Sequence, residues 1–199
     1  MLLTILDLIA IAPCCFSRIP QIRLLKKTRN ISGVSFESII LDLFCYMNVA
    51  GFSYYQSYPI LGYLEYPASI LQNVVLLATL ADISGNHFRP TCFIALLTAW
   101  FFIIGNIPKN IALFVISLNS IVGVSGKAAQ IQEIRKSGTS NNVSSATFLL
   151  NGAASLARMI SLGMAGVAEY ILIINSGVSV LANLAVLITI HLNQTKKQE

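Results

Sequence analysis

Residues 18–27 read Arg-Ile-Pro-Gln-Ile-Arg-Leu-Leu-Lys-Lys, and residues 127–136 read Lys-Ala-Ala-Gln-Ile-Gln-Glu-Ile-Arg-Lys. The two segments align without a gap at a spacing of 109 residues, and the alignment continues through Val34-Ser35 on Val143-Ser144. After one inserted residue, residues 69–73 align with residues 179–183. Self-similarity at a fixed spacing indicates a repeated structural unit. Chance similarity between apolar helices rarely preserves loop length and polar positions together, so we interpret this match as an internal repeat.

The composition indicates a chain that lies in lipid. Of the 199 residues, 55% are hydrophobic and 11% are charged, whereas a soluble domain has about 25% charged residues. Helices that cross a bilayer need roughly 20 apolar residues. With residues 2–17, the uncharged stretches that approach this length predict seven spans: 43–64, 66–81, 90–108, 110–126, 137–157 and 170–195. We therefore expect an all-α membrane protein with seven transmembrane helices and the lipid bilayer as its first partner.

The repeat and the number of spans together predict the architecture. Three helices reverse the direction of the chain across the membrane, so a second copy in the same orientation requires one additional helix between the copies. The prediction is a 3+1+3 arrangement of two parallel triple-helix repeats. Residues 1–84 form the first repeat, 85–108 the linker helix, 109–192 the second repeat and 193–199 a tail.

The distribution of basic residues predicts the orientation. Of the 13 Lys and Arg residues, eleven fall on one side of a seven-span topology. The positive-inside rule then places the N-terminus in the lumen and the C-terminus in the cytosol. The net charge of +5 follows from this topology and requires no nucleic acid as a partner. Glycosylation sequons at Asn30, Asn142 and Asn193 lie on the cytosolic side, so we expect no glycan on them.

The segment Ile19-Pro20-Gln21-Ile22, the basic residues after it and Gly33-Val34-Ser35 resemble the PQ-loop repeat. That family includes the sugar-exporting SWEETs, cystinosin and the mannose-P-dolichol utilization defect 1 protein. Residues 58–67 resemble the solute carrier family 66 branch. The resemblance implies a transporter of a small polar solute, such as a sugar or an amino acid, that works by alternating access. The dolichol-related member implies an alternative, a non-transporting accessory in dolichol-linked sugar utilisation.

The PQ motif itself predicts a kink. Pro20 lacks an N–H and crowds the carbonyl of Phe16, and the freed carbonyl needs a partner within the membrane. Gln21 could supply that donor. The bend is either a hinge for a cytosolic gate or a static kink. The second copy has Gln130 preceded by Ala129 instead of proline, which leaves hinge behaviour in that half open.

Asn73 and Asn183 occupy matching positions near the middle of the third helix of each repeat. Two amides that face each other across a pseudo-twofold axis offer donors and acceptors to a polar solute. The resemblance to SWEETs implies a sugar-contacting pair at such positions. The alternative is that each amide bonds a neighbouring helix.

Asp42 and Asn151 are also repeat equivalents. A carboxylate inside the membrane costs about 2.5–3.5 kcal/mol unless it is paired, protonated or hydrated. Asp42 is therefore either a proton-coupling carboxylate or the partner of Lys127 or Arg18 in an ion pair.

Asn151, Ser155 and Arg158 form a polar stripe at helical spacing. Arg158 has three possible roles: it holds an anionic group in the path, extends to the membrane interface, or pairs with Glu169.

The remaining residues set limits on function and location. The sequence contains no nucleophile–base set, phosphate loop or metal-ligand spacing, so we expect neither an enzyme nor a cofactor. A homo-oligomer is compatible with the sequence. Lys196 and Lys197 lie fourth and third from the end and match a dilysine retrieval signal, which favours the endoplasmic reticulum among the endomembranes, with the lysosome as the alternative.

Overall fold

The computed structural model describes residue 11 and residues 14–58, 60–137, 140, 143–164 and 170–195. Throughout these ranges the regular structure is helical. The elements in chain order are α2 (Ile19–Thr28), α3 (Phe36–Tyr55), η1 (Ile60–Gly62), α4 (Glu65–Ser84), α5 (Phe88–Asn106), α6 (Lys109–Ser117), α7 (Asn119–Ser137), α8 (Ser145–Met164) and α9 (Tyr170–Thr195).

Five helical segments are long and apolar enough to cross a membrane. They are Phe36–Tyr55, Glu65–Ser84, Phe88–Asn106, Lys109–Ser137 and Leu172–Gln194. Large apolar side chains point outward from these helices; Phe88, Leu181 and Ile121 are 81%, 68% and 66% exposed. A continuous apolar exterior on several long helices fits a lipid environment, and the chain is a multi-pass helical membrane protein.

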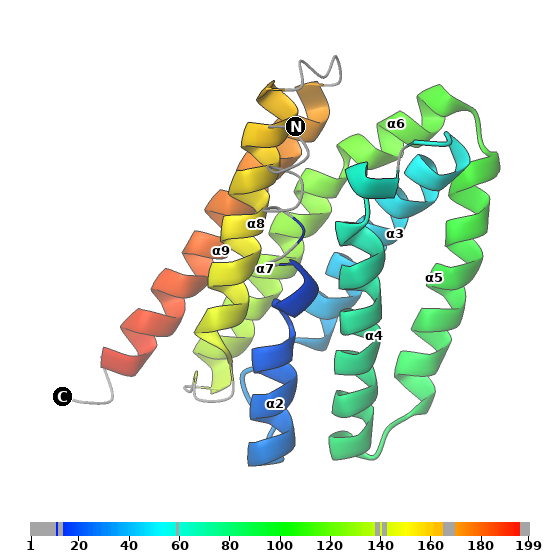
Figure 1. Cartoon of the computed structure of the whole chain (residues 1–199). Helices are drawn as coiled ribbons and strands as arrows, with labels where there is room; N and C mark the ends of the chain where they lie inside the picture. Colours follow the sequence, from blue (N-terminus) through cyan, green and yellow to red (C-terminus); the bar gives the residue numbers. More distant parts are fainter. Residues whose placement is uncertain are drawn as a thin grey trace.

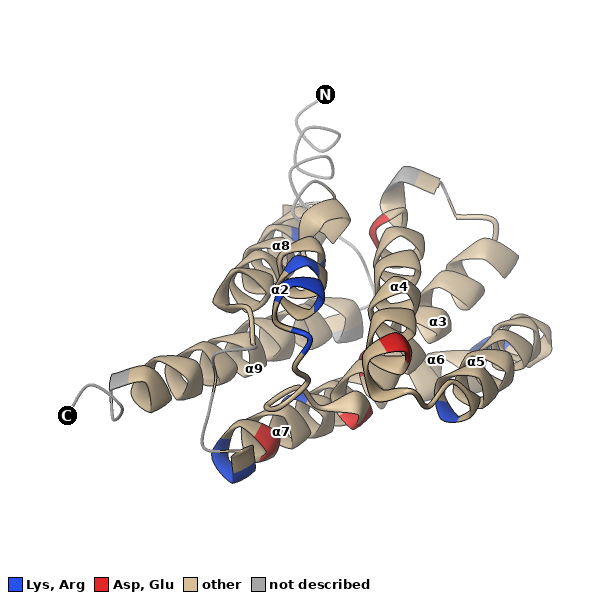
Figure 2. Cartoon of the chain, turned by 90° about the horizontal axis from the view of Figure 1, so that it is seen from below, with Lys and Arg blue, Asp and Glu red and all other residues tan. Residues whose placement is uncertain are grey.

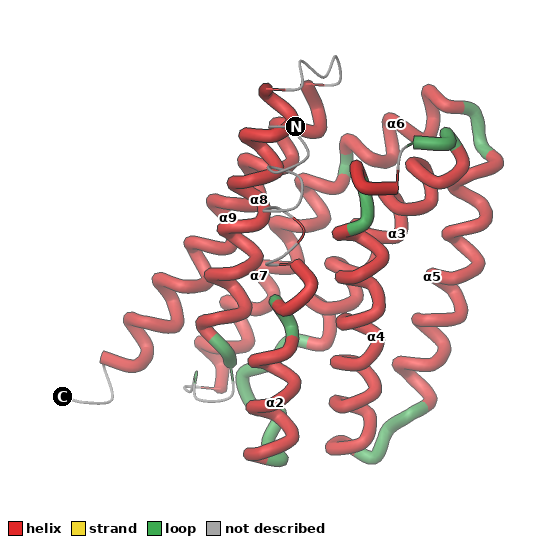
Figure 3. The backbone as a smooth tube through the Cα atoms, viewed as in Figure 1, coloured by secondary structure: helices red, strands yellow, loops and turns green. Residues whose placement is uncertain are grey.

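The loops gather at two opposite ends of the helices (Figures 1 and 3). The α2–α3, α4–α5 and α7–α8 connections share one end, and the α3–α4 and α5–α6 connections share the other. The first end carries Lys26 and Lys27 in the last turn of α2 and Arg135 and Lys136 in the last turn of α7. Figure 2 shows these basic residues and the one at the start of α5. We call it the basic end.

Helix contacts divide the molecule into two groups that touch along two seams. Helix α3 packs against α4 and α5, while α9 packs against α8 and α7. The two groups meet where α3 contacts the continuous α6–α7 segment and where α2 contacts α8. The repeat alignment relates α2 to the second half of α7, and α3 to α8, so the two seams join equivalent pairs of segments.

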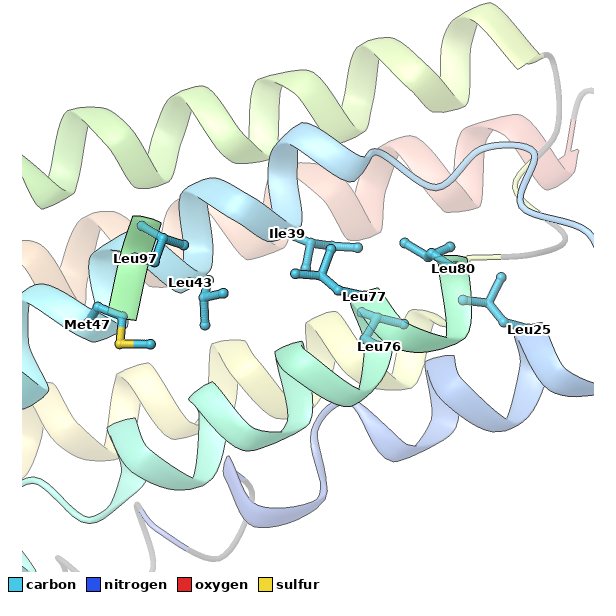
Figure 4. Packing of buried hydrophobic residues seen from close by; sticks show 8 residues of the cluster. All are labelled: Leu25, Ile39, Leu43, Met47, Leu76, Leu77, Leu80 and Leu97. Atoms are coloured by element: carbon cyan, nitrogen blue, oxygen red, sulfur yellow. The ribbon is translucent and has the colours of Figure 1, made fainter. Parts of the chain in front are cut away.

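Three hydrophobic clusters form the core of the described residues, and one of them contains Phe52, Ile104, Ala112 and Ile116. The other two are related by the repeat. The first is built from α2, α3, α4 and α5 and contains Leu25, Ile39, Leu43, Met47, Leu76, Leu77, Leu80 and Leu97 (Figure 4). The second contains Ile134, Val143, Phe148, Val186 and Ile190. Four pairs of core residues lie 109 or 110 positions apart: Leu25 and Ile134, Ile39 and Phe148, Leu76 and Val186, Leu80 and Ile190. The spacing that relates the loops in sequence therefore also relates buried positions.

Several predicted span boundaries are wrong, all for the same reason. The prediction used uncharged stretches, but α3 begins at Phe36 rather than at 43 and contains Asp42. Likewise α7 continues to Ser137 through Lys127, and α8 runs from Ser145 to Met164 through Arg158. These charges lie inside helices because they are paired there, which removes much of the cost of burying them.

The predicted span count is only partly confirmed. Helix α8 has 20 residues but is not among the five segments that satisfy both length and composition, since its polar stripe lowers its hydropathy. Most of the first predicted span, residues 1–10, 12 and 13, lies outside the described residues.

Candidate functional site

A cavity of about 160 Å³ lies between α3, α4, α7, α8 and α9. Most of its described wall is apolar, but polar and charged side chains project into it from every one of these helices. Among them are two acids and two bases: Asp42, Glu65, Lys127 and Arg158. A polar cavity between helices of a membrane protein is where substrate sites are found.

A three-residue charge cluster lies at the side of the cavity nearer the basic end. Lys127 Nζ donates to Asp42 Oδ1 at 2.9 Å and to Oδ2 at 2.7 Å. Arg18 Nη2 donates to Asp42 Oδ2 at 2.5 Å. All three residues are buried. Arg18 and Lys127 are repeat equivalents, so the two repeats supply matching cations to one carboxylate.

Asp42 forms the ion pair that the sequence offered as one of its two roles, with both Lys127 and Arg18 rather than with one of them. Arg18 and Lys127 lie just outside the predicted spans 2–17 and 110–126, whereas both side chains are buried between helices. They lie inside because a carboxylate on α3 compensates them.

A second ion pair lies at the other side of the cavity. Arg158 Nε on α8 donates to Glu65 Oε1 on α4 at 2.7 Å, and both side chains are buried. The sequence offered a pair with Glu169 as one of three roles for Arg158; Glu169 lies outside the described residues, so that pair stays a prediction. The pair with Glu65 was not predicted, because Glu65 and Arg158 are 93 residues apart and occupy no equivalent repeat positions.

Arg158 also lines a second cavity of about 280 Å³, which lies toward the α3–α4 loop and is lined mainly by apolar side chains such as Phe52 and Leu113. Val49, Tyr66 and Leu172 line both cavities. Arg158 and Tyr66 thus line both the cavity that holds the charge cluster and the more apolar one.

Asn73 and Asn183 have the same local geometry but different surroundings. In each, Nδ2 donates at 2.8 Å to the carbonyl four residues earlier, Ser69 for one and Ser179 for the other. Each Oδ1 is buried and accepts no hydrogen bond from the described residues. Asn183 lines the cavity and Asn73 does not.

Of the two amides that were predicted to face each other, only Asn183 therefore lines the cavity. At the level of Asn73, the segment before α2 lies against α4, because Gln72 Nε2 donates to the carbonyl of Cys14 at 2.7 Å. Cys14 lines the cavity there. Asn73 is fully buried and is absent from the cavity lining.

Asn151, the repeat equivalent of Asp42, also lines the cavity. Its Nδ2 is buried and donates no hydrogen bond to any described residue. One turn along α8, Ser155 Oγ lies 2.9 Å from Ser179 Oγ on α9. The stripe of Asn151, Ser155 and Arg158 that the sequence predicted therefore faces the cavity as a whole.

The glutamines of the two PQ positions lie outside the cavity, toward the basic end. Gln130 Oε1 accepts from the backbone N–H of Ser35 at 3.0 Å, and Gln130 Nε2 donates to the carbonyl of Gly33 at 2.5 Å. Gln21 Oε1 accepts from the backbone N–H of Ser144 at 2.5 Å. Each glutamine therefore binds the loop before the second helix of the opposite repeat. We call these contacts the glutamine clasp.

The chain bends where the proline predicted it. A helical turn ends at Phe16, Ser17 and Arg18 form a turn, and α2 restarts at Ile19 with Pro20 in its first turn. The missing N–H of proline costs nothing at that position. The backbone N–H of Arg18 donates to Gln72 Oε1 at 3.0 Å. In the second repeat, where alanine replaces the proline, α7 runs uninterrupted past Gln130.

One polar network was missed by the sequence analysis. Trp100 Nε1 donates to Asn48 Oδ1 at 2.6 Å, and Asn48 Nδ2 donates to Asn119 Oδ1 at 2.8 Å. These bonds tie α5 to α3 and to the start of α7. The signal that could have found it is the single tryptophan of the chain, since a buried indole N–H requires an acceptor.

Two predicted features lie outside the described residues. These are the dilysine signal of Lys196 and Lys197 and the middle sequon at Asn142. Both stay predictions.

Two comparisons of the sequence with known proteins find similar proteins. The family model for the PQ loop repeat matches residues 2–62. The chain is also similar to solute carrier family 66 member 3 of Homo sapiens, with 32% identity over 148 residues, which is 74% of this chain and 73% of the relative. The predicted resemblance to the solute carrier family 66 branch is confirmed.

Proposed function

Because this chain belongs to the PQ-loop repeat family, we propose that it is a carrier, not an enzyme, that moves a small polar solute across an endomembrane by alternating access. In this proposal α2, α3 and α4 belong to the first triple-helix unit, α5 is the linker, and α7, α8 and α9 form the second unit. The solute occupies the cavity between the units.

The observation that carries the proposal is a cavity lined in part by charged and amide side chains, with a closed contact on each side of it. Toward the basic end, the Asp42 cluster and the glutamine clasp join the two units. Toward the opposite end, the Glu65–Arg158 pair joins α4 to α8. Alternating access requires contacts of this kind that open in turn, and ion pairs and hydrogen bonds between packed units can exchange between two arrangements.

Flux measured in proteoliposomes tests this function. The purified full chain is reconstituted, and uptake of radiolabelled D-glucose, L-alanine and D-glycerate is followed against protein-free vesicles. We expect protein-dependent uptake of at least one solute, and we expect Asn183→Ala to reduce it at least tenfold. Thr189→Ala is the matched control, because Thr189 is on the same helix, does not line the cavity, and bonds its own helix backbone.

Uptake equal to that of empty vesicles for every solute class would contradict the carrier proposal. The alternative function, an accessory in dolichol-linked sugar utilisation, predicts a different result. In that case vesicle flux is absent, and cells that lack the protein accumulate truncated lipid-linked oligosaccharides. Normal lipid-linked oligosaccharides together with measurable flux support the carrier.

A further inference from the structure

The charged residues around the cavity do not balance. The Glu65–Arg158 pair is neutral, but Asp42 is shared between Lys127 and Arg18, all of them buried. Among the described residues no second acid forms an ion pair with either cation. The cluster therefore carries one surplus positive charge away from water, which is costly unless an anion accompanies it.

A comparison of the two repeats shows which position lacks a carboxylate. Each repeat supplies one cation, Arg18 in the first and Lys127 in the second, at equivalent positions. Only the first repeat supplies a carboxylate, Asp42; its equivalent in the second repeat is the neutral amide of Asn151. Both Lys127 and Asn151 line the cavity, so the place of the second carboxylate opens onto the space that a solute would occupy.

Among the cavity-lining residues outside the ion pairs, Asn151 and Asn183 each have a buried polar atom with no hydrogen-bond partner among the described residues. Asn151 Nδ2 is a donor and Asn183 Oδ1 is an acceptor. Buried polar groups in native structures are nearly always bonded, and an unbonded one destabilises its surroundings. Neither atom has accessible surface in this conformation, but both residues line the cavity. A change of side-chain rotamer would therefore let a solute with an acceptor anion at one point and a hydroxyl donor at another satisfy both atoms.

The cavity limits the size of that solute. Its volume of about 160 Å³ is close to the engineered cavity of about 150 Å³ that holds benzene. A molecule of a few carbon atoms fits, whereas a disaccharide or a peptide exceeds the space.

We propose that the solute is a small hydroxycarboxylate with one negative charge, its carboxylate bound by Lys127 and Asn151 and its hydroxyl donating to Asn183. This assignment rests on the proposed carrier function and names its substrate class. It also explains why two repeat-equivalent cations meet only one protein carboxylate.

Binding to the purified full chain tests the assignment, with D-glycerate as the probe and glycerol as its uncharged counterpart. We expect glycerate to raise the thermal unfolding temperature in a saturable manner and glycerol to leave it unchanged. Asn151→Asp places a carboxylate where we assign that of the solute, so it should abolish glycerate binding while the protein remains folded. Asn151→Leu keeps the charge of the site and removes one hydrogen bond, so binding should weaken about tenfold.

Three results would overturn the assignment: equal stabilisation by glycerate and glycerol, undiminished glycerate binding in Asn151→Asp, or tighter binding of inorganic phosphate than of glycerate. Absence of stabilisation by every anion would also overturn it. The carrier function is judged separately. Uptake of glucose or alanine without glycerate binding rejects only the hydroxycarboxylate, whereas glycerate binding without flux of any solute rejects only the carrier.

Discussion

Gln130 in α7 accepts a hydrogen bond from the backbone N–H of Ser35, which precedes α3. Gln21 and Ser144, which lie 109 positions from Gln130 and Ser35, form the same contact in the opposite direction. The contact is isologous in the sense of a twofold interface. In both repeats the glutamine at this position therefore bonds the loop before the second helix of the other repeat.

Removal of the clasp should loosen the basic end. In Gln130→Ala, the N–H of Ser35 and the carbonyl of Gly33 lose their partner, and each unsatisfied buried group costs about 1–3 kcal/mol. We expect a lower unfolding temperature in detergent. Gln132→Ala is the control, because Gln132 is exposed on the same helix. Equal stability of the two variants would show that the clasp contributes nothing.

The Asp42 cluster predicts an unequal response to removal of its members. Asp42→Asn leaves two buried cations without their carboxylate and should destabilise the protein by about 3–5 kcal/mol. Lys127→Met should cost less, because Asp42 keeps its 2.5 Å contact with Arg18. Chemical denaturation of both variants checks the order. A larger effect of Lys127→Met would contradict the assigned pairing.

The Glu65–Arg158 pair should respond to an exchange of charge. Each single variant, Glu65→Arg or Arg158→Glu, brings like charges within the 2.7 Å contact and should prevent folding or lower stability strongly. The double variant restores opposite charges and should recover a measurable part of the loss in a double-mutant cycle. No recovery in the double variant would mean that the pair is not a direct interaction.

Close packing of α5 on α3 predicts a steric effect. A Cβ on Gly105 would lie 1.9 Å from the ring of Tyr55, whereas a Cβ on Gly163 meets no atom within 4 Å. Gly105→Ala should therefore destabilise the protein by about 1–3 kcal/mol, and Gly163→Ala should be neutral or slightly stabilising. Thermal unfolding of the two variants side by side checks this. Equal unfolding temperatures would mean that α5 does not pack on α3 in this way.

The orientation also makes a prediction. If the basic end faces the cytosol, as the positive-inside rule implies, the sequons at Asn30, Asn142 and Asn193 remain unmodified. Treatment of the protein from cells with an endoglycosidase should leave its electrophoretic mobility unchanged. A mobility shift that is lost in one of the Asn→Gln variants would reverse the orientation.

Much of the fold was predictable because the repeat and the apolar stretches are local signals. The alignment of residues 18–27 with 127–136 predicted the equivalence of Leu25 and Ile134, which both occupy cores. Helix boundaries were less predictable, because a charge inside a helix looks like a loop residue until its partner is known. Arg158 is the clearest example, since the carboxylate that pairs with it is 93 residues away.

The site was predictable in type but not in detail. Asn183, Asn151 and Arg158 were expected on the path and do line the cavity. Asn73 was expected there too, but Cys14 forms that part of the wall, because the turn before Pro20 lays the chain against α4. No sequence pattern indicates that the segment around Cys14 lies against α4. None indicates that Arg158 pairs with Glu65.

The most direct test of the account is whether the cavity opens to both sides of the membrane. Cys14, Cys15, Cys45 and Cys92 are replaced, Ser155→Cys is introduced on the cavity wall, and a membrane-impermeant maleimide is applied to either side of sealed vesicles. A second version carries Gln21→Cys and Ser144→Cys, joined by a cleavable cross-linker. We predict labelling of position 155 from both sides, with the cross-link abolishing only the labelling from the basic side. Labelling from a single side regardless of the cross-link, or from neither side, would contradict the account.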